Sequence, residues 1–249
     1  APFISGLGER LKLWIDHHTH ERHVDFVGDA RFVLVSRHDH PACPELVTPA
    51  RVAAAGAVDT VVCHSDFDGI ASAAKFLLGG REPYVGCDAD ARAIDSRVGE
   101  CGPRGERLAA ALAIRHDEAM LRMVLQSLVN SDEPGAVVRA IDAAAEKYRL
   151  RVERTRQAVG RGERIGGAWL VDSRNSKRKL DRTQALILAQ ERATYGLFLG
   201  GDGRLSLATP MSTPIDLTAV FGTRGGMQNR ITLPIKRLSE VLAFVESQD

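Results

Sequence analysis

Aspartate and histidine residues follow two apolar segments in the N-terminal part of the chain, where they could serve as metal ligands. One group follows the apolar segment 11–15, and the other follows the β-branched segment 58–63. The candidates are His17, with Asp16 and His18 beside it, and His64, Asp66 and Asp68. Carboxylates suit hard cations such as Mn2+, and neutral imidazole extends the choice toward transition metals. The two groups therefore predict a divalent-cation site.

Ordinary structural roles could explain the same residues. Asp66 could cap the helix that follows it, and Gly69 could supply an unusual backbone angle. Asp16, His17 and His18 could form a polar junction between a strand and a loop. Because two such motifs occur in one chain, we favour the metal interpretation for both.

Strands and helices are predicted to alternate in the segment that carries these residues. The strands are expected at 11–15, 32–35, 58–63 and 83–87. A short helix should begin at Thr48 and Pro49, which suit the N-cap and the first helical position, and another is expected at about 70–78. The pattern predicts an α/β fold with a mostly parallel sheet flanked by helices. Ligands of such sheets gather beyond the carboxyl ends of the strands, where both groups fall.

The remainder of the chain divides into a helical part and a second α/β part. Residues 104–160 are predicted to form two helices with one break at 131–135, and the second helix, about 136–158, is a connector. Beyond Arg161 we expect a helix at about 181–193, which Asp181 and Gln184 begin in a pattern like a capping box. Strands are expected near Leu197 and Leu205, with a turn at Gly201-Asp202-Gly203. The predicted domains are 1–130 (catalytic), 131–162 (helical connector) and 163–249 (a smaller α/β domain).

Composition indicates a globular protein with a sizeable core. The chain has 249 residues, 44% of them apolar, and 33 Lys plus Arg balance 32 Asp plus Glu, so no whole-protein charge marks a duplex-coating protein. Cys43, Cys63, Cys87 and Cys101 form no Cys-x-x-Cys pair and are interpreted as reduced, mostly buried thiols. We find no signal peptide and no apolar run of the ~18 residues that a membrane span requires, which predicts a cytoplasmic protein.

The two motifs resemble the DHH phosphoesterase family. Its members carry Asp-x-Asp-Gly, often preceded by histidine, on one strand and Asp-His-His on another; the matching segments here are 64–69 and 16–18. The usual order is reversed in this chain, which looks like a circular permutation. The loop 222–230 is similar to a divergent form of the Gly-Gly-Gly-His loop in the DHH-associated domain, with Met227 or Gln228 near the histidine position.

The resemblance implies a DHH-like domain, a DHH-associated domain and a Mn2+-dependent phosphoesterase. Two ions are expected, with Mg2+ or Co2+ as alternatives, and they would activate water for hydrolysis of a small nucleotide or a short oligonucleotide. His18 would lie beside the substrate phosphate, and Asp16 would orient an imidazole. Arg224, Gly225, Gly226 and Arg230 would bind the anionic substrate, and a homodimer stays open.

The carboxylate that bridges two metals in the family has no clear counterpart. Asp88 and Asp90, after the expected strand 83–87, are two candidates for it. Asp39 is a further candidate metal ligand, and the alternative interpretation of Asp39 is a solvated turn. An aspartate strand ahead of Ala1 would also supply it. The sequence does not choose between these sources.

Other functions remain open. The same metal core serves pyrophosphatases and polyphosphatases, and the low aromatic content, 5%, slightly favours phosphate-rich ligands over stacked bases. A non-catalytic nucleotide-binding or nucleic-acid-binding module is the alternative from another class, motivated by the unassigned bridging carboxylate. The natural substrate, the oligomeric state, the number of metals and the physiological role are not fixed by the sequence.

Overall fold

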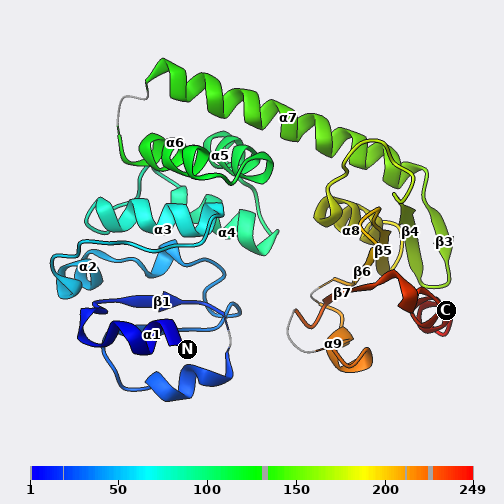
Figure 1. Cartoon of the computed structure of the whole chain (residues 1–249), viewed down its shortest axis with the longest axis horizontal. Coiled ribbons are helices and arrows are strands. Elements are labelled where there is room, and N and C mark those ends of the chain that lie inside the picture. The colour runs from blue at the N-terminus through cyan, green and yellow to red at the C-terminus, as the bar shows by residue number, and fades with distance from the viewer. Residues whose placement is uncertain (1, 19, 131–133, 211, 224–226, 249) are drawn as a thin grey trace. The chain divides into compact units, whose positions relative to one another are not determined.

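The computed structural model describes residues 2–18, 20–130, 134–210, 212–223 and 227–248 (Figure 1). The chain divides into two compact units, 1–148 and 149–249. The long helix α7 (Gly135–Gly160) runs through the boundary between them. Among the described residues, no helix is both long and apolar enough to cross a membrane. The three-part division expected from the sequence stays a prediction.

The first unit is mostly helical and contains a small parallel sheet. Strands β1 (Trp14–Asp16) and β2 (Phe32–Leu34) pair in parallel, with Ile15 opposite Val33. The α-helices that accompany them are α1 (Pro2–Leu7), α2 (Pro49–Ala55), α3 (Phe67–Leu77), α4 (Cys87–Ser96), α5 (Pro103–Ile114) and α6 (Glu118–Val129). Short 3-10 turns lie at Gly8–Arg10 (η1), Glu21–Phe26 (η2) and Pro44–Leu46 (η3).

Helix α3 lies at the centre of the first unit. It packs against α4, α5, α6 and the turn η3, and it lies between β1 and the layer of α5 and α6 in Figure 1. Ala71 and Ala74 are fully buried, so their small side chains let the neighbouring helices approach closely. Leu108 and Met120 are also fully buried and fill this core from α5 and α6. Close packing on several sides consequently restricts the position of α3.

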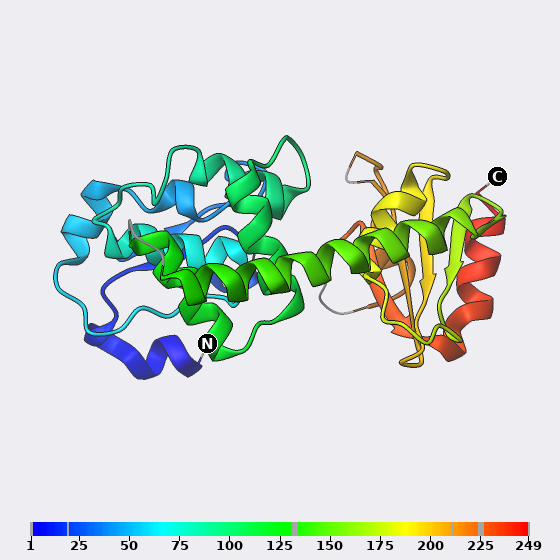
Figure 2. The same cartoon turned by 90° about the horizontal axis from the view of Figure 1, so that it is seen from above.

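The second unit is a five-stranded mixed sheet with helices packed on it (Figure 2). The strand order is β3 (Glu163–Ile165), β4 (Ala168–Asp172), β5 (Tyr195–Leu199), β6 (Arg204–Ala208) and β7 (Arg230–Pro234). Only the β4–β5 pair is parallel among these described strands. Helices α8 (Arg182–Gln190), α9 (Leu217–Val220) and α10 (Leu238–Glu246), with the 3-10 turn η4 (Ile235–Arg237), complete it.

Local capping signals predicted helix starts correctly. The Thr48 side chain accepts a hydrogen bond of 3.3 Å from the Arg51 N–H, and Pro49 opens α2. Asp181 accepts one of 2.9 Å from the Gln184 N–H at the start of α8. Short polar side chains at these positions satisfy backbone donors that the helix leaves unpaired.

The strands expected at 58–63 and 83–87 are absent from the described structure. The parallel sheet of the first unit is therefore smaller than predicted, with two described strands. Residues 58–63 are assigned no strand, although the general α/β class is confirmed. Val62 is 73% exposed, and β-branched residues form strands where a neighbouring strand and a packed face receive them. Residues 83–87 form a turn into α4, in which Gly86 has a φ of 90°. That left-handed conformation suits glycine and ends an extended segment.

The helical region contains one more break than expected. Residues 104–160 were predicted to form two helices, whereas the structure has α5, α6 and α7 there. Asp117 starts α6 and accepts a hydrogen bond of 3.0 Å from the Met120 N–H. Residues 115–118, Arg-His-Asp-Glu, interrupt the apolar pattern, and the prediction did not use this signal or the suitability of Asp117 as an N-cap.

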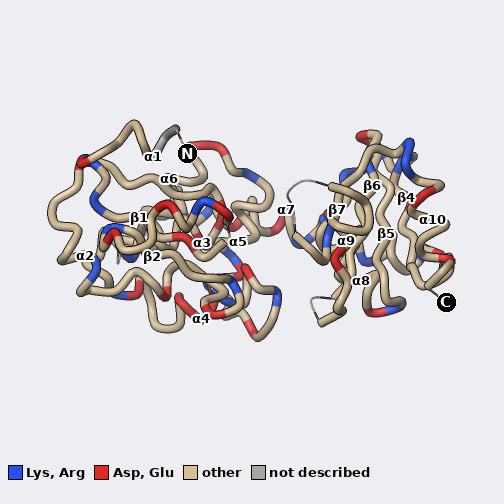
Figure 3. Tube along the Cα trace, turned by 90° about the horizontal axis from the view of Figure 1, so that it is seen from below, with Lys and Arg blue, Asp and Glu red and all other residues tan. Residues whose placement is uncertain are grey.

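Charged residues of both signs are interspersed along the described parts of both units (Figure 3). Their arrangement agrees with the near-balance of Lys plus Arg and Asp plus Glu in the sequence. Any attraction for an anionic substrate must therefore come from local groups of side chains.

Leu108→Ala should test the core that supports α3. Leu108 is fully buried, so its truncation should lower the free energy of unfolding by about 2–5 kcal/mol. Val98→Ala is the control, because Val98 is 70% exposed and its truncation should change stability by less than about 0.5 kcal/mol. Urea unfolding measures both, and equal losses in the two variants would contradict this description of the core.

Candidate metal centre

His17 turns inward directly after β1 and is 1% exposed. Its Nδ1 lies 3.2 Å from the carbonyl oxygen of His40. A carbonyl oxygen only accepts hydrogen bonds, so Nδ1 carries the proton in this contact and Nε2 presents a lone pair in the neutral ring. Nε2 faces Asp68 Oδ2 and Asp95 Oδ2, each at 3.9 Å. These separations exceed a hydrogen bond, and the buried lone pair faces two carboxylates.

Asp68 lies in the first turn of α3 and is 9% exposed. Its Oδ1 accepts a hydrogen bond of 2.8 Å from the Cys43 N–H. Burial raises the pKa of Asp68 to about 7, with further increases from Asp95 and Asp66, against the lowering effect of the Cys43 hydrogen bond. The ionised carboxylate is therefore short of positive charge in this site.

The donor set fits a divalent cation. The candidate ligand atoms of His17, Cys43 and Asp68 all lie within 4.8 Å of one another. Nitrogen and oxygen ligands sit about 2.0–2.2 Å from a transition metal, so two of them can be up to about 4.4 Å apart across the ion. The 3.9 Å separation of His17 Nε2 and Asp68 Oδ2 falls within that limit. A cation between them would relieve the repulsion of acceptor atoms.

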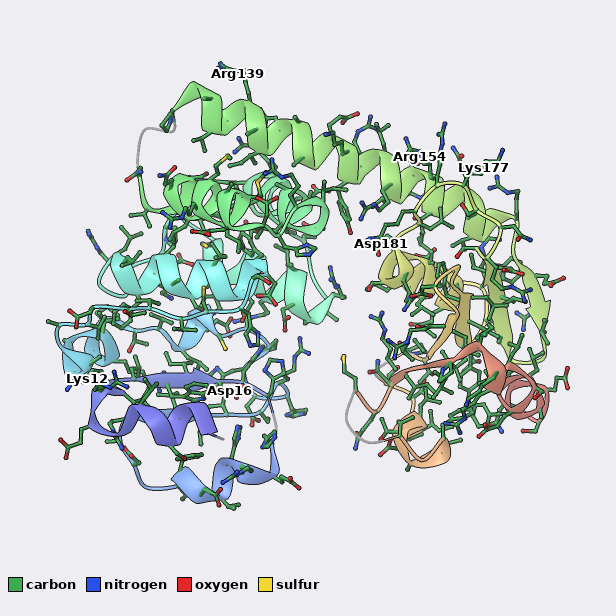
Figure 4. The ribbon with its side chains drawn as sticks, in the orientation of Figure 1. Lys12, Asp16, Arg139, Arg154, Lys177 and Asp181 are labelled. Atoms are coloured by element: carbon green, nitrogen blue, oxygen red, sulfur yellow. The ribbon has the colours of Figure 1, made fainter. Side chains whose placement is uncertain are left out.

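Asp16, labelled in Figure 4, ends β1. It contacts two histidines. Its Oδ1 lies 2.9 Å from the His18 N–H and 3.1 Å from His18 Nδ1, and its Oδ2 lies 3.6 Å from His23 Nε2. Although burial raises the pKa of Asp16, the hydrogen bonds from His18 and the two imidazoles hold it below the usual value. Asp16 thus fixes the orientation of the half-exposed His18 ring.

The second motif approaches the first through His64 and Asp68. The His18 and His64 rings have centroids 6.2 Å apart. Asp66 is exposed and caps α3 by accepting a hydrogen bond of 2.9 Å from the Gly69 N–H. The capping role considered for Asp66 therefore exists, beside any ligand role.

Gly69 is required for this approach. A Cβ atom at Gly69 would lie 2.7 Å from the His64 backbone nitrogen, closer than packed atoms allow. Its φ is not in the left-handed region, so close contact, and not an unusual backbone angle, explains the glycine. The backbone of residue 64 consequently lies directly on the first turn of α3.

The weaker ligand candidates have other described contacts. Asp39 is exposed; its Oδ2 accepts a hydrogen bond from Ser36 Oγ, and its N–H donates one to the same oxygen, as in a solvated turn. Asp88 pairs with the buried Lys75. Asp90 accepts hydrogen bonds from Tyr84 Oη at 2.7 Å and from the Gly102 N–H at 2.6 Å. Asp39 and Asp88 line one open hollow of about 690 Å³.

The predicted substrate loop is described only in part. Arg224, Gly225 and Gly226 lie outside the described residues. Arg230 begins β7, and its Nη1 donates a hydrogen bond of 3.1 Å to Thr183 Oγ1. The substrate-binding role of this loop stays a prediction.

Three residues of the centre were missed by the sequence interpretation. Cys43 contributes its thiol and its N–H, Asp95 stands opposite His17, and Arg37 forms an ion pair with Asp95. None of them belongs to a motif, and only the packing of α4 and of the loop before η3 brings them to His17. A search for aspartate on every helix packed against α3 would have found Asp95.

Comparison with known proteins gives little further information. Neither protein-family models nor curated proteins match the chain. A pGpG-specific phosphodiesterase, PggH from Vibrio cholrae, is a structural neighbour with a TM-score of 0.47 and 12% sequence identity. The alignment covers 66% of this chain and 67% of that one. A TM-score below 0.5 does not establish a shared fold.

Gly69→Ala should weaken cation binding, because the added methyl group displaces residue 64 and the first turn of α3. We expect the affinity for Mn2+ or Co2+ to fall about 10-fold to 100-fold, as when the surroundings of a metal ligand are disturbed. Gly160→Ala is the control, because a Cβ there meets no atom within 4 Å. Isothermal titration calorimetry measures both affinities, and an unchanged affinity in Gly69→Ala would contradict the close-contact explanation.

Proposed function

We propose that the chain is a metal-dependent phosphoesterase that acts on small nucleotides or short oligonucleotides. One observation carries the proposal: the two motifs that resemble those of the DHH family meet in space. His17 of the first motif faces Asp68 of the second at 3.9 Å, and the rings of His18 and His64 are neighbours. The expectation from sequence that they would form one site supports the same function.

The residues around the centre divide into a buried and an exposed group. His17 and Asp68 are buried, whereas His18, His64 and Asp66 reach solvent. A divalent cation held by the buried group would supply Lewis-acid activation of a phosphoryl oxygen and of water. His18, oriented by Asp16, would contact the substrate phosphate from the exposed side and hold a proton at its other ring nitrogen.

Mn2+ remains the proposed cation, with two ions per site and Mg2+ or Co2+ as alternatives. Asp95 places a further carboxylate beside His17 and Asp68, where the sequence left one unassigned, and its Oδ2 also pairs with Arg37. This carboxylate favours a catalytic site over a non-catalytic module. Phosphoanhydride hydrolysis uses the same chemistry and is the second candidate within enzymes.

Hydrolysis of a substrate panel tests the function. We expect a dinucleotide, a cyclic dinucleotide, a nucleotide bisphosphate or pyrophosphate to be cleaved with Mn2+ and not with chelator. Asp68→Asn should reduce turnover to the chelator level, because an amide is a poor cation ligand and carries no charge. Asp142→Asn is the control, since Asp142 is an exposed carboxylate paired with Arg107. Absence of cleavage for every substrate, in wild type and with every cation, would instead support the binding module.

Arg230→Ala tests the substrate-binding role of the C-terminal loop. Loss of a hydrogen bond to a charged group costs about 1.5–3 kcal/mol, so KM should rise roughly 10-fold to 100-fold while kcat changes little. Arg122→Ala is the control, because Arg122 is exposed on α6 and pairs with Glu118. Steady-state kinetics separate the two parameters, and an unchanged KM in Arg230→Ala would remove Arg230 from substrate binding.

A further inference from the structure

Cys43 lies beside His17 and Asp68 in the candidate cation centre. It lies in the loop before η3, between Ala42 and Pro44, which are both buried. Its thiol is one of the three ligand atoms within 4.8 Å of one another, with a ring nitrogen of His17 and an Asp68 oxygen. Its backbone N–H is already used by Asp68 Oδ1. The same residue therefore holds one ligand in place and presents a second.

The neighbouring imidazole provides an independent indication of a ligand. His17 is 1% exposed, and its Nδ1 contacts the His40 carbonyl, while its Nε2 lies 3.9 Å from Asp68 Oδ2 without a hydrogen bond to it. A zinc-like ion binds sulfur at about 2.3 Å and nitrogen at about 2.0–2.1 Å, so it can hold the two atoms up to about 4.4 Å apart. A small side-chain rotation of Cys43 would bring sulfur, nitrogen and oxygen around one ion.

We propose that Cys43 Sγ coordinates one of the two cations as a thiolate, and that this one position, unlike the rest of the site, prefers thiophilic or borderline ions such as Zn2+ and Co2+ over Mn2+ and Mg2+. The inference rests on the cation site of the proposed function and names the class of metal that this position selects. Imidazole suits zinc and cobalt, and thiolate favours soft or borderline ions, whereas all-oxygen sites suit magnesium and manganese. On binding, the sulfur–metal bond forms and the thiol proton passes to solvent.

The anchoring of the Cys43 loop supports a fixed ligand. Lys75 is 6% exposed and donates a hydrogen bond of 2.9 Å to the carbonyl oxygen of Pro44, the residue next to Cys43. Lys75 also pairs with Asp88 of α4. The loop is thereby tied to both α3 and α4, so that the thiol is held beside Asp68 before any cation binds.

Cobalt spectroscopy of the full chain tests the inference. Protein stripped of metal by chelator is titrated with Co2+ under reducing, oxygen-free conditions, and the near-ultraviolet absorption of a sulfur–cobalt bond is recorded. Wild type should show this absorption, and Cys43→Ser and Cys43→Ala should not. Cys101→Ser, which changes another partly buried cysteine, should keep it. Circular dichroism establishes that the variants are folded.

Competition between cations gives the second measurement. In Cys43→Ser the affinity for Zn2+ should fall by at least roughly 10-fold to 100-fold, because removal of even a residue that hydrogen-bonds to a metal ligand has an effect of that size. The affinity for Mn2+ should change much less. In the wild type, Zn2+ should also protect Cys43 from alkylation, detected by peptide mass spectrometry, and leave Cys101 reactive.

The outcomes separate the ligand role from the proposed function. Co2+ binding in wild type without the sulfur absorption, or with equal absorption in Cys43→Ser, overturns the role of Cys43 even if Mn2+-dependent hydrolysis is found. Sulfur absorption that depends on Cys43, in a protein that cleaves no substrate, upholds the ligand role and removes the phosphoesterase. Absence of any cation binding overturns both.

Discussion

His17 Nε2 lies 3.9 Å from a carboxylate oxygen of Asp68 and of Asp95, and this close approach of one buried imidazole and two carboxylates is the constraint on which the centre depends. A buried acceptor that faces other acceptors is costly unless a proton or a cation lies between them. The His40 carbonyl fixes the ring from the other side, so the imidazole cannot turn away without losing a hydrogen bond. The packing of α3 and α4 then brings Asp68 and Asp95 to the same point. Because Arg37 already pairs with the Asp95 oxygen that faces His17, the positive charge that is still lacking here is the one beside Asp68 Oδ2.

Small and charged residues on α3 allow the neighbouring segments to approach His17 closely. Gly69 lets the backbone of residue 64 lie on the first turn, and the buried Ala71 and Ala74 let the neighbouring helices close around it. Lys75, one turn later than Ala71, is buried and holds the loop that carries Cys43. Residues on different faces of this one helix thus position ligands from other segments. Substitutions far from His17 along this helix act on the same centre through packing.

The sequence predicted features whose causes are local. The N-caps Thr48 and Asp181 were predicted because their side chains bond to donors three residues away. The strands expected at 58–63 and 83–87 failed because strand formation depends on partners that a local pattern does not contain. The motif residues were identified from type and spacing, and the structure brings His17 and Asp68 together. The positions of Cys43, Asp95 and Arg37 follow only from tertiary packing, and no spacing along the chain encodes them.

The division between buried and exposed ligands bears on how such a centre would operate. A cation among His17, Cys43 and Asp68 would be shielded from water, where electrostatic attraction is strong and exchange is slow. On the exposed side, His18 and His64 stand close to each other, and this side can exchange water for substrate. Tight binding of an ion and access for a substrate make opposite demands on burial. Asp68 lies between the buried and the exposed group: one of its oxygens accepts a hydrogen bond from the Cys43 N–H, and the other faces His17.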